Sequence, residues 1–257
     1  MKVEKDKFRV GNVFISNTTP NEAHQKITQF ALQGQGGYIC VSNIRMVRYA
    51  GKHSDYKRLM DKSLMNLPDG TPLTWCGKLW GLKKITCTNG PALFKSMLAT
   101  GDKNLKHYLL GDTQDILSKI ISINEKLYHA NLAGAEELPF TSVENFDYKN
   151  IANRITASGC NIVWTAMRAP KQDEFNRILS SYLPNIPFVG VGRAFRIFTG
   201  EVRQAPHWAE KMGISGIFNR RKSLAVTYIW YFESSLFMVS YFIRILWRRL
   251  TGRKCNE

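Results

Sequence analysis

The sequence lacks the short motifs with which proteins most often bind a metal ion. Its five cysteines are scattered without a C-x-x-C pair, and its five histidines have neither H-x-x-H nor H-x-x-x-H spacing. Zinc sites need such clusters, so none is predicted. The D-x-D triplet is also absent. A diphosphate ligand held through a carboxylate-bound metal is therefore not expected.

Two further absences narrow the class of protein. No G-x-G-x-x-G follows the first apolar run with an acidic residue about 20 positions later, which argues against a nicotinamide dehydrogenase. The charged residues 1–9 contain no apolar h-region, so no secretory signal is predicted. The scattered cysteines suit a reducing compartment, and a cytoplasmic location is expected.

Length and charge set the broad expectations. The chain has 257 residues, 44% of them hydrophobic, which suffices for one main domain with a buried core. It carries 36 Lys+Arg against 20 Asp+Glu, a formal net charge of +16. So large a positive charge favours an anionic partner, and nucleic acid, anionic lipid and a diphosphate ligand all qualify.

Short apolar runs alternate with amphipathic segments along residues 1–205. The capping box Thr19-Pro20-Asn21-Glu22 predicts the start of the first helix, which continues to about residue 32. Strands are expected at 38–41, 64–67, 106–110, 161–166 and 187–192, and further helices at 45–50, 55–63, 73–80, 89–99 and 173–183. This alternation predicts one α/β domain with a Rossmann-like, mainly parallel sheet and helices on both faces.

The C-terminal part, residues 206–257, differs in kind. From 223 to 247 the sequence is apolar and aromatic, with Glu233 and Arg244 as its only charged residues, and basic residues flank it on both sides. Three interpretations fit: a core helix, a membrane-spanning helix, or an aromatic-rich helix lying on the bilayer. A central glutamate is costly in lipid, whereas Tyr and Trp favour the interface. A helical appendage that associates with the membrane surface is therefore the favoured interpretation.

Polar residues follow three of the predicted strands. Ser42 and Asn43 come after the first, Asp69 lies in a Pro-Asp-Gly turn after the second, and Lys171 and Gln172 follow the fourth. The carboxyl ends of parallel strands share one edge of the sheet, where ligands of such folds bind. Structural interpretations remain open beside this one. A turn aspartate can bond its own backbone, and Ser42 or Asn43 can cap the next helix.

The turn Pro68-Asp69-Gly70, combined with Ala169-Pro170-Lys171-Gln172-Asp173, resembles motifs of the WecG/TagA/CpsF family of bacterial glycosyltransferases. The stretch that begins Gly190-Val191-Gly192-Arg193-Ala194-Phe195 is also similar to that family, and the resemblance covers roughly residues 8 to 220. It implies an enzyme that adds a sugar from a nucleotide donor to a lipid-linked acceptor on the cytoplasmic face of the membrane.

The resemblance implies roles for individual residues. Asp69 corresponds to the proposed general base, which takes the proton from the acceptor hydroxyl as that oxygen attacks the anomeric carbon. Ser42 and Asn43 match a Thr-Asn pair, with serine in place of threonine, and are expected to bond a sugar hydroxyl or to fix Asp69. Gln172 matches the family glutamine and, with Lys171 at a helix N-terminus, is expected to face the donor phosphates.

Other matches concern the nucleotide and the acceptor. The residues expected to hold the nucleotide are Asn89, Gly90, Gly111 and Gly192. Arg168 replaces a family glycine, and it either adds a phosphate contact or reshapes the pocket. A later family motif has lost its Glu and Trp, whereas Arg220 remains and Arg221 adds charge for a diphosphate or a lipid phosphate.

These observations favour an inverting, metal-independent glycosyltransferase. It is expected to transfer a hexose-type sugar from a UDP-sugar to a polyprenyl-diphosphate-linked saccharide, without a cofactor, in polysaccharide or cell-envelope glycan synthesis. We expect it to work as a peripheral protein on the cytoplasmic face of the bacterial inner membrane. The alternative is a basic nucleic-acid-binding protein, for which the sequence shows no recognition motif.

Overall fold

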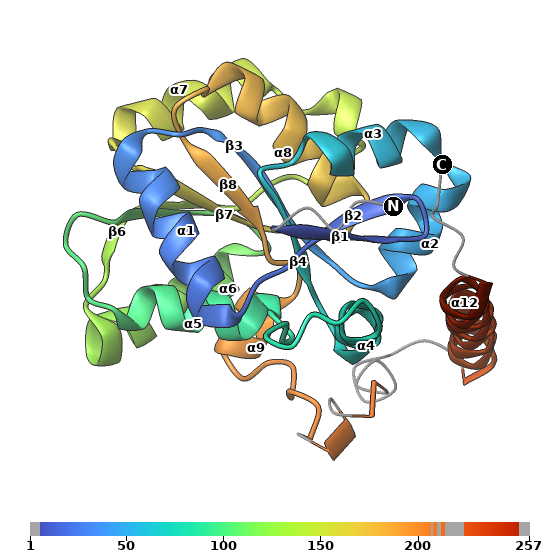
Figure 1. The fold of residues 1–257 in the computed structure, drawn as a ribbon. Helices are drawn as coiled ribbons and strands as arrows, with labels where there is room; N and C mark the ends of the chain where they lie inside the picture. The colour runs from blue at the N-terminus through green and yellow to red at the C-terminus, as the bar shows by residue number, and fades with distance from the viewer. Residues whose placement is uncertain (1–5, 207, 210–211, 214–223, 252–257) are drawn as a thin grey trace.

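The computed structural model describes residues 6–206, 208–209, 212–213 and 224–251. Its centre is a six-stranded parallel sheet in the order β4-β3-β8-β7-β5-β6 (Figure 1). The strands are β3 (Gly37–Ser42), β4 (Met65–Pro68), β5 (Lys106–Gly111), β6 (Asn131–Glu136), β7 (Ile162–Ala166) and β8 (Pro187–Gly190). The predicted α/β fold with a parallel sheet is confirmed, and each of the five expected strands is present.

Helices cover both faces of this sheet (Figure 1). One face carries α1 (Pro20–Gln33), α5 (Gly90–Ala99), α6 (Gln114–Ile123) and α9 (Ala194–Phe198). The other carries α2 (Ile44–Lys52), α3 (Ser54–Lys62), α7 (Tyr148–Ser158) and α8 (Lys171–Tyr182). Ile39 of β3 packs with the first set, whereas Tyr38 and Cys40 pack with the second. Burial on both faces explains why the strands are continuous apolar runs.

The ends of α1 follow directly from the local sequence. The Thr19 hydroxyl accepts from the Glu22 N–H at 3.2 Å, and the Glu22 carboxylate accepts from the Thr19 N–H at 2.9 Å. Gly34 then ends the helix in the left-handed conformation, with φ of +64°, and its N–H bonds the Phe30 carbonyl. The predicted capping box is thus confirmed.

An N-terminal hairpin was not predicted. It consists of the antiparallel strands β1 (Lys7–Val10) and β2 (Val13–Ser16). Asn66 of β4 donates from its Nδ2 to the Phe14 carbonyl at 2.9 Å and from its N–H to the Ser16 hydroxyl at 3.1 Å. The hairpin therefore covers the β4 end of the sheet.

The described residues also form α4 (Thr71–Leu79), α12 (Leu224–Thr251), a short π-helix (Asn124–Tyr128) and a 3-10 turn (Val143–Asn145). One face of α12 packs against the α/β domain. The Tyr241 hydroxyl accepts from Trp80 Nε1 at 2.6 Å and donates to the Arg9 carbonyl at 2.7 Å. Arg48 of α2 pairs with Glu233 at 2.5 Å. The glutamate that would be costly in lipid is thus neutralised by a cation of the domain.

The opposite face of α12 is exposed. Apolar residues recur along it at alternating steps of three and four, and each is more than half exposed. These residues, which we call the α12 stripe, are Ile229, Phe232, Leu236, Val239, Ile243, Leu246 and Leu250. Within the described part of the chain, no helix combines the length and apolarity needed to cross a membrane. The core-helix interpretation therefore holds for one face of α12 only.

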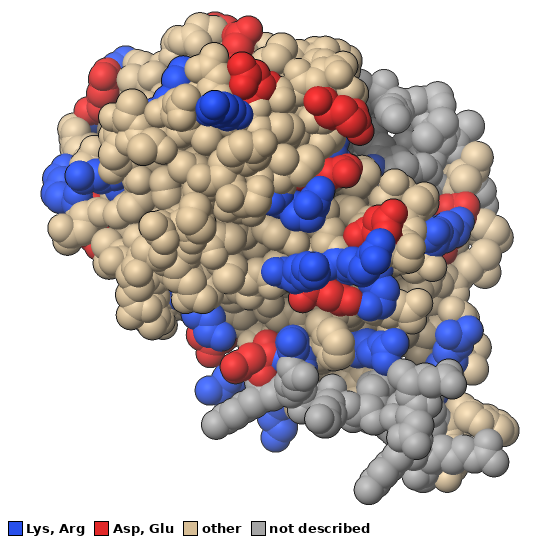
Figure 2. Space-filling model, turned by 90° about the horizontal axis from the view of Figure 1, so that it is seen from above, with Lys and Arg blue, Asp and Glu red and all other residues tan. Residues whose placement is uncertain are grey.

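Figure 2 shows acidic and basic side chains interleaved on the face of the molecule seen from above. Several basic side chains lie directly beside acidic ones, and a broad area of this face carries few charged side chains. Among the described residues of this face, the basic side chains form no continuous track of the kind that follows a nucleic-acid backbone.

Candidate active site

The carboxyl ends of five strands bring most of the predicted residues to one edge of the sheet. β4 and β3 end side by side, with Pro68 opposite Ser42, and β8 pairs with the other side of β3. β7 and β5 follow, with Ala166 opposite Gly111. We call this line of strand ends, from the loop after β4 to the loop after β5, the carboxyl edge.

Asp69 is held at the carboxyl edge by backbone contacts with two neighbouring segments. Its N–H donates to the Ser42 carbonyl at 2.8 Å, and the Pro68 carbonyl accepts from the Thr88 N–H at 2.8 Å. Gly70, with φ of +99°, then turns the chain into α4. Asp69 is half-buried. The turn thus fixes the position of this residue while leaving it partly open to solvent.

Two residues that bond this turn through their backbones carry buried hydroxyl groups. Ser42 and Thr88 are each 1% exposed, and neither hydroxyl has a hydrogen-bond partner among the described residues. A buried hydroxyl without a partner costs about 1–3 kcal/mol of desolvation, so its presence needs a reason. The sequence pointed to Ser42 but not to Thr88, because a lone threonine in an irregular segment belongs to no recognisable motif.

Asn43 caps α2. Its Oδ1 accepts from the Arg45 N–H at 3.1 Å and from the Met46 N–H at 3.3 Å. The N-cap interpretation is thus confirmed for this residue. The cap uses the amide oxygen, and it fixes the side chain at the carboxyl edge directly after Ser42.

Asn89, Gly90 and Gly192 meet at one point of the carboxyl edge. Asn89 caps α5, with its Oδ1 accepting from the Ala92 N–H at 2.9 Å. Gly90 packs so closely on the loop after β8 that an added Cβ would lie 2.8 Å from the Val191 carbonyl oxygen. Gly192 has a φ of +60°. The two glycines therefore let the start of α5 approach the β8 loop.

Gln172 is buried between two loops of the carboxyl edge. Its Oε1 accepts from the Met167 N–H at 3.0 Å and from the Gly192 N–H at 2.9 Å. These two N–H groups belong to the loops after β7 and β8. In this structure the amide joins the two loops, and the expected contact with donor phosphates stays a prediction.

The two cations that follow β7 are oriented differently. Lys171 donates from Nζ to the Thr141 carbonyl, and its Nζ lies 5.0 Å from the ring centroid of Phe146 and 5.5 Å from that of Phe140. It is thus directed toward the segment before α7. Arg168 is exposed at the end of β7. Of the two, Arg168 is the cation that is open to solvent.

β5 and β7 lie side by side, but the chain leaves them in opposite directions. β5 continues through α6 to the edge strand β6, whereas β7 continues through α8, on the other face, to β8 (Figure 1). Ligands of open α/β sheets bind at such a reversal of strand order. Gly111 lies there with φ of +101°, and an added Cβ would be 3.2 Å from the Ala166 carbonyl oxygen.

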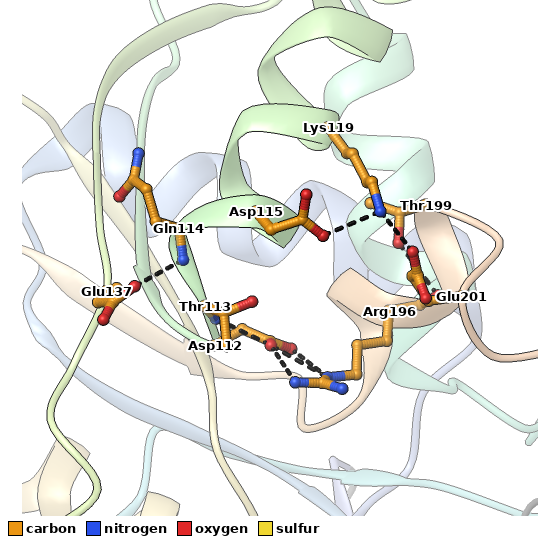
Figure 3. Close-up of polar contacts among 9 residues, drawn as sticks. All are labelled: Asp112, Thr113, Gln114, Asp115, Lys119, Glu137, Arg196, Thr199 and Glu201. Atoms are coloured by element: carbon orange, nitrogen blue, oxygen red, sulfur yellow. Dashed lines mark hydrogen bonds and ion pairs between the residues drawn. The ribbon is translucent and has the colours of Figure 1, made fainter.

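An ion pair between Asp112 and Arg196 lies next to this reversal (Figure 3). Arg196 Nε is 3.0 Å from both carboxylate oxygens, and its Nη2 is 2.7 Å from Oδ1. The side chain of Asp112 is 6% exposed and that of Arg196 is 43% exposed. The hydrogen bond with Asp112 raises the pKa of Arg196 above its ordinary value. The pair, which joins α9 to the end of β5, was not predicted.

Figure 3 also shows a carboxylate at the start of α6. Glu137, from the loop after β6, accepts from the Gln114 N–H at 2.6 Å. One turn farther along, Lys119 pairs with Asp115 at 2.9 Å and with Glu201 at 2.5 Å. These contacts connect α6 with the loops after β6 and α9.

The predicted phosphate ligands Arg220 and Arg221 lie outside the described residues. Among the residues that the structure does describe, no group of three or more His, Cys, Asp and Glu side chains could hold a metal ion. At the carboxyl edge, the Asp112 carboxylate is paired with Arg196, whereas the half-buried Asp69 lies in the turn that the Ser42 and Thr88 backbones bond.

Comparison with known proteins places these residues in a wider context. A model of the glycosyl transferase WecG/TagA/CpsF family matches residues 8–247. Two similar proteins are both named N-acetylglucosaminyldiphosphoundecaprenol N-acetyl-beta-D-mannosaminyltransferase. The one from Bacillus subtilis (strain 168) is 24% identical over 185 residues, covering 71% of this chain and 70% of that protein. The one from Bacillus spizizenii is 25% identical over 180 residues, covering 70% and 68%.

Proposed function

The chain belongs to the WecG/TagA/CpsF family of glycosyltransferases, and we propose that it transfers a hexose-type sugar from a UDP-sugar to a polyprenyl-diphosphate-linked saccharide. The names of both relatives specify N-acetylglucosaminyldiphosphoundecaprenol as the acceptor and N-acetylmannosamine as the sugar transferred. We infer the same class of acceptor for this chain and a role in cell-envelope glycan synthesis.

The position of Asp69 carries this proposal. Its carboxylate removes the proton from the acceptor hydroxyl as that oxygen forms a bond to the anomeric carbon of the donor. The bond between this carbon and the donor phosphate oxygen breaks, and UDP leaves with its electron pair. Attack from the side opposite to UDP inverts the configuration of the anomeric carbon.

The buried hydroxyl groups of Ser42 and Thr88 support the same assignment. Both residues bond the turn that holds Asp69 through their backbones, and both hydroxyl groups lack a partner among the described residues. A substrate hydroxyl, or the Asp69 carboxylate after a small movement of the turn, would supply the missing partner. Either contact would orient the base relative to the acceptor.

Cations are proposed to take the place of a metal at the diphosphate. The leaving UDP gains negative charge as its bond to the sugar breaks, and arginine stabilises such charge through paired N–H groups. Arg168 is the exposed cation at the end of β7, whereas Lys171 bonds Thr141 in this structure. Arg168 is therefore the favoured ligand, with Arg220 and Arg221 as further candidates from the sequence.

The α12 stripe supports a position on the membrane surface, where a lipid-linked acceptor is found. Its seven residues form an apolar row opposite the docked face, as in helices that lie in the headgroup region. From residue 219 onward the sequence carries eight Lys and Arg against two Glu. Each basic residue near an anionic surface adds about 1 kcal/mol of attraction. We propose that the enzyme lies on the cytoplasmic face of the membrane.

A panel of UDP-sugars tests the proposed function. The full chain is incubated with an N-acetylglucosaminyl diphosphate lipid in vesicles and with UDP-N-acetylmannosamine, its uronic acid, UDP-N-acetylglucosamine or UDP-glucose. We expect transfer from at least one donor, and the one-bond C1–H1 coupling of the product should show the inverted anomer. Transfer from none would contradict the proposed substrates, and a retained anomer would contradict the inverting mechanism.

A further inference from the structure

Asp173 is a buried carboxyl group directly behind the carboxyl edge. It follows Gln172 on α8 and is 3% exposed. The Tyr56 hydroxyl of α3 donates to its Oδ2, and the side chains of Gln172 and Cys40 lower its pKa. Groups from α3, β3 and its own helix thus favour the ionised form of one carboxyl group. A charged group so far from solvent is costly unless it is well paired.

Gln172 connects this carboxyl group to the carboxyl edge. Its Nε2 lies against β8, where an added Cβ at Gly190 would come within 2.4 Å. Its Oε1 accepts from the N–H groups of Met167 and Gly192. An amide has one accepting oxygen and one donating nitrogen, and the neighbouring negative charge of Asp173 favours the orientation in which the oxygen faces the two N–H groups.

Asp173 is surrounded by titratable and charged groups from four elements. The groups that shift the pKa of Asp173, or the pKa of the tyrosines near it, are Tyr38 and Cys40 on β3, Arg45 on α2, Tyr56 on α3 and Arg177 on α8. Burial raises the pKa of Asp173 to about 6, whereas the Tyr56, Gln172 and Cys40 side chains lower it. Its charge therefore changes close to neutral pH.

We propose that ionised Asp173 is a positioning residue: bonded by the Tyr56 hydroxyl and next to Gln172 on α8, its negative charge favours the amide orientation that keeps the loops after β7 and β8 in the arrangement that binds the donor. Asp173 does not touch the substrate itself. Protonation removes this negative charge, and the Gln172 amide is then no longer held in one orientation. The donor-binding part rests on the proposed function, whereas the effect on the two loops does not.

Hydrogen exchange tests the effect on the loops without any ligand. The protection of the Met167 and Gly192 amides is measured by NMR between pH 5 and pH 7.5 and corrected for the intrinsic exchange rate. In the parent protein we expect protection of both amides to fall below about pH 6, and in Asp173→Asn to be low throughout. The Asp69 amide, which bonds the Ser42 carbonyl, serves as the internal control. Equal protection in both proteins at every pH would overturn the proposal.

Donor binding supplies the second measurement. UDP-N-acetylglucosamine is a suitable probe because its diphosphate has no group that titrates in this range. Calorimetry of the parent protein is expected to show about a tenfold loss of affinity per pH unit below about pH 6, as for a ligand that needs one ionised group. Asp173→Asn should bind more weakly and without this pH dependence. A carboxyl group with a purely structural role would change the unfolding temperature but not this profile.

A pair of tyrosine variants makes the test independent of Asp173→Asn. Tyr56→Phe removes a hydrogen bond that favours ionised Asp173, so the pKa should rise and the loss of affinity should begin at higher pH. Tyr148→Phe is the matched control. Its buried hydroxyl donates to the Val143 carbonyl at 2.8 Å on the same face of the sheet, and it should leave the profile unchanged.

The outcomes separate the two proposals. If UDP-N-acetylglucosamine and the other UDP-sugars do not bind at any pH, the proposed donor class is wrong, and hydrogen exchange still decides the role of Asp173. If they bind with a profile that neither Asp173→Asn nor Tyr56→Phe alters, the positioning role is overturned. If Asp173→Asn does not fold, the comparison of Tyr56→Phe with Tyr148→Phe decides the question.

Discussion

The backbone N–H of Asp69 donates to the carbonyl oxygen of Ser42 at 2.8 Å and so joins the ends of β4 and β3. The strand register that places Ser42 opposite Pro68 sets this contact. A slip of one residue would turn the Ser42 side chain to the other face of the sheet. The parallel sheet thus brings Ser42, with its buried hydroxyl, and the half-buried Asp69 into backbone contact from distant parts of the sequence.

Ser42→Ala is expected to lower turnover without destabilising the fold. Because the hydroxyl is buried without a partner among the described residues, its loss breaks no hydrogen bond there and relieves a desolvation cost of about 1–3 kcal/mol. Turnover should fall about tenfold if the hydroxyl orients the base or the sugar. Thermal unfolding and steady-state kinetics measure the two effects.

Ser158→Ala is the control for this variant. Its hydroxyl donates to the Ile155 carbonyl at 2.7 Å, far from the carboxyl edge. The Ser158→Ala protein should be slightly less stable than the parent, because it loses this hydrogen bond, and should keep full turnover. A Ser42→Ala protein that is less stable but fully active would show that the hydroxyl serves the fold alone.

Arg196→Ala is expected to destabilise the fold, because it leaves the carboxylate of Asp112 without its ion-pair partner. Breaking a fully buried pair costs about 3–5 kcal/mol. The side chain of Arg196 is 43% exposed, and solvent lowers the expected loss to about 1–2 kcal/mol. Urea unfolding measures the change. Lys119→Ala, whose ion pairs are exposed, should unfold like the parent, and the same result for Arg196→Ala would refute this role of the pair.

The double variant Leu236→Asp, Val239→Asp is expected to release the protein from anionic vesicles. It places two charges in the middle of the α12 stripe, which is proposed to enter the headgroup region. Ser235→Asp, Ser240→Asp introduces the same charge at exposed positions beside the stripe and is the matched control. Sedimentation with vesicles measures binding. Equal binding of both double variants would show that the stripe is not inserted.

Activity is expected to persist in excess EDTA. The sequence lacks D-x-D, and the described residues offer no cluster of carboxylate, histidine and cysteine ligands. Cations are proposed to stabilise the leaving diphosphate instead. Transfer rates with and without EDTA, followed by addition of Mg²⁺, measure the requirement. A complete loss of activity that Mg²⁺ restores would contradict metal independence.

The central strands of the sheet could be predicted because both their faces are buried. β3, β7 and β8 are mostly apolar runs, as expected for parallel strands that are covered on both faces. β6 is a half-buried strand at the edge of the sheet, and its sequence NLAGAE contains no β-branched or aromatic residue. β1 begins within a charged N-terminal stretch that hid its alternating pattern.

The candidate site could be predicted where a residue directly follows a strand. Asp69 and Ser42 meet at one edge because parallel strands end there together. Thr88 and the Asp112–Arg196 pair could not be predicted, since they depend on packing between segments that are distant in sequence. Gln172 was identified, but its bonds to two loop amides depend on β7 and β8 lying next to each other.

Replacement of Asp69 by asparagine tests the central claim most directly. Asparagine keeps the size of the side chain but cannot take up the proton, so turnover should fall by roughly 10²- to 10⁴-fold while affinity for the UDP-sugar and the far-UV spectrum stay nearly unchanged. Asp55→Asn, at an exposed aspartate on α3, is the control and should remain fully active. Turnover of Asp69→Asn within about threefold of the parent, measured with a lipid-linked acceptor, would contradict the assignment of Asp69 as the base.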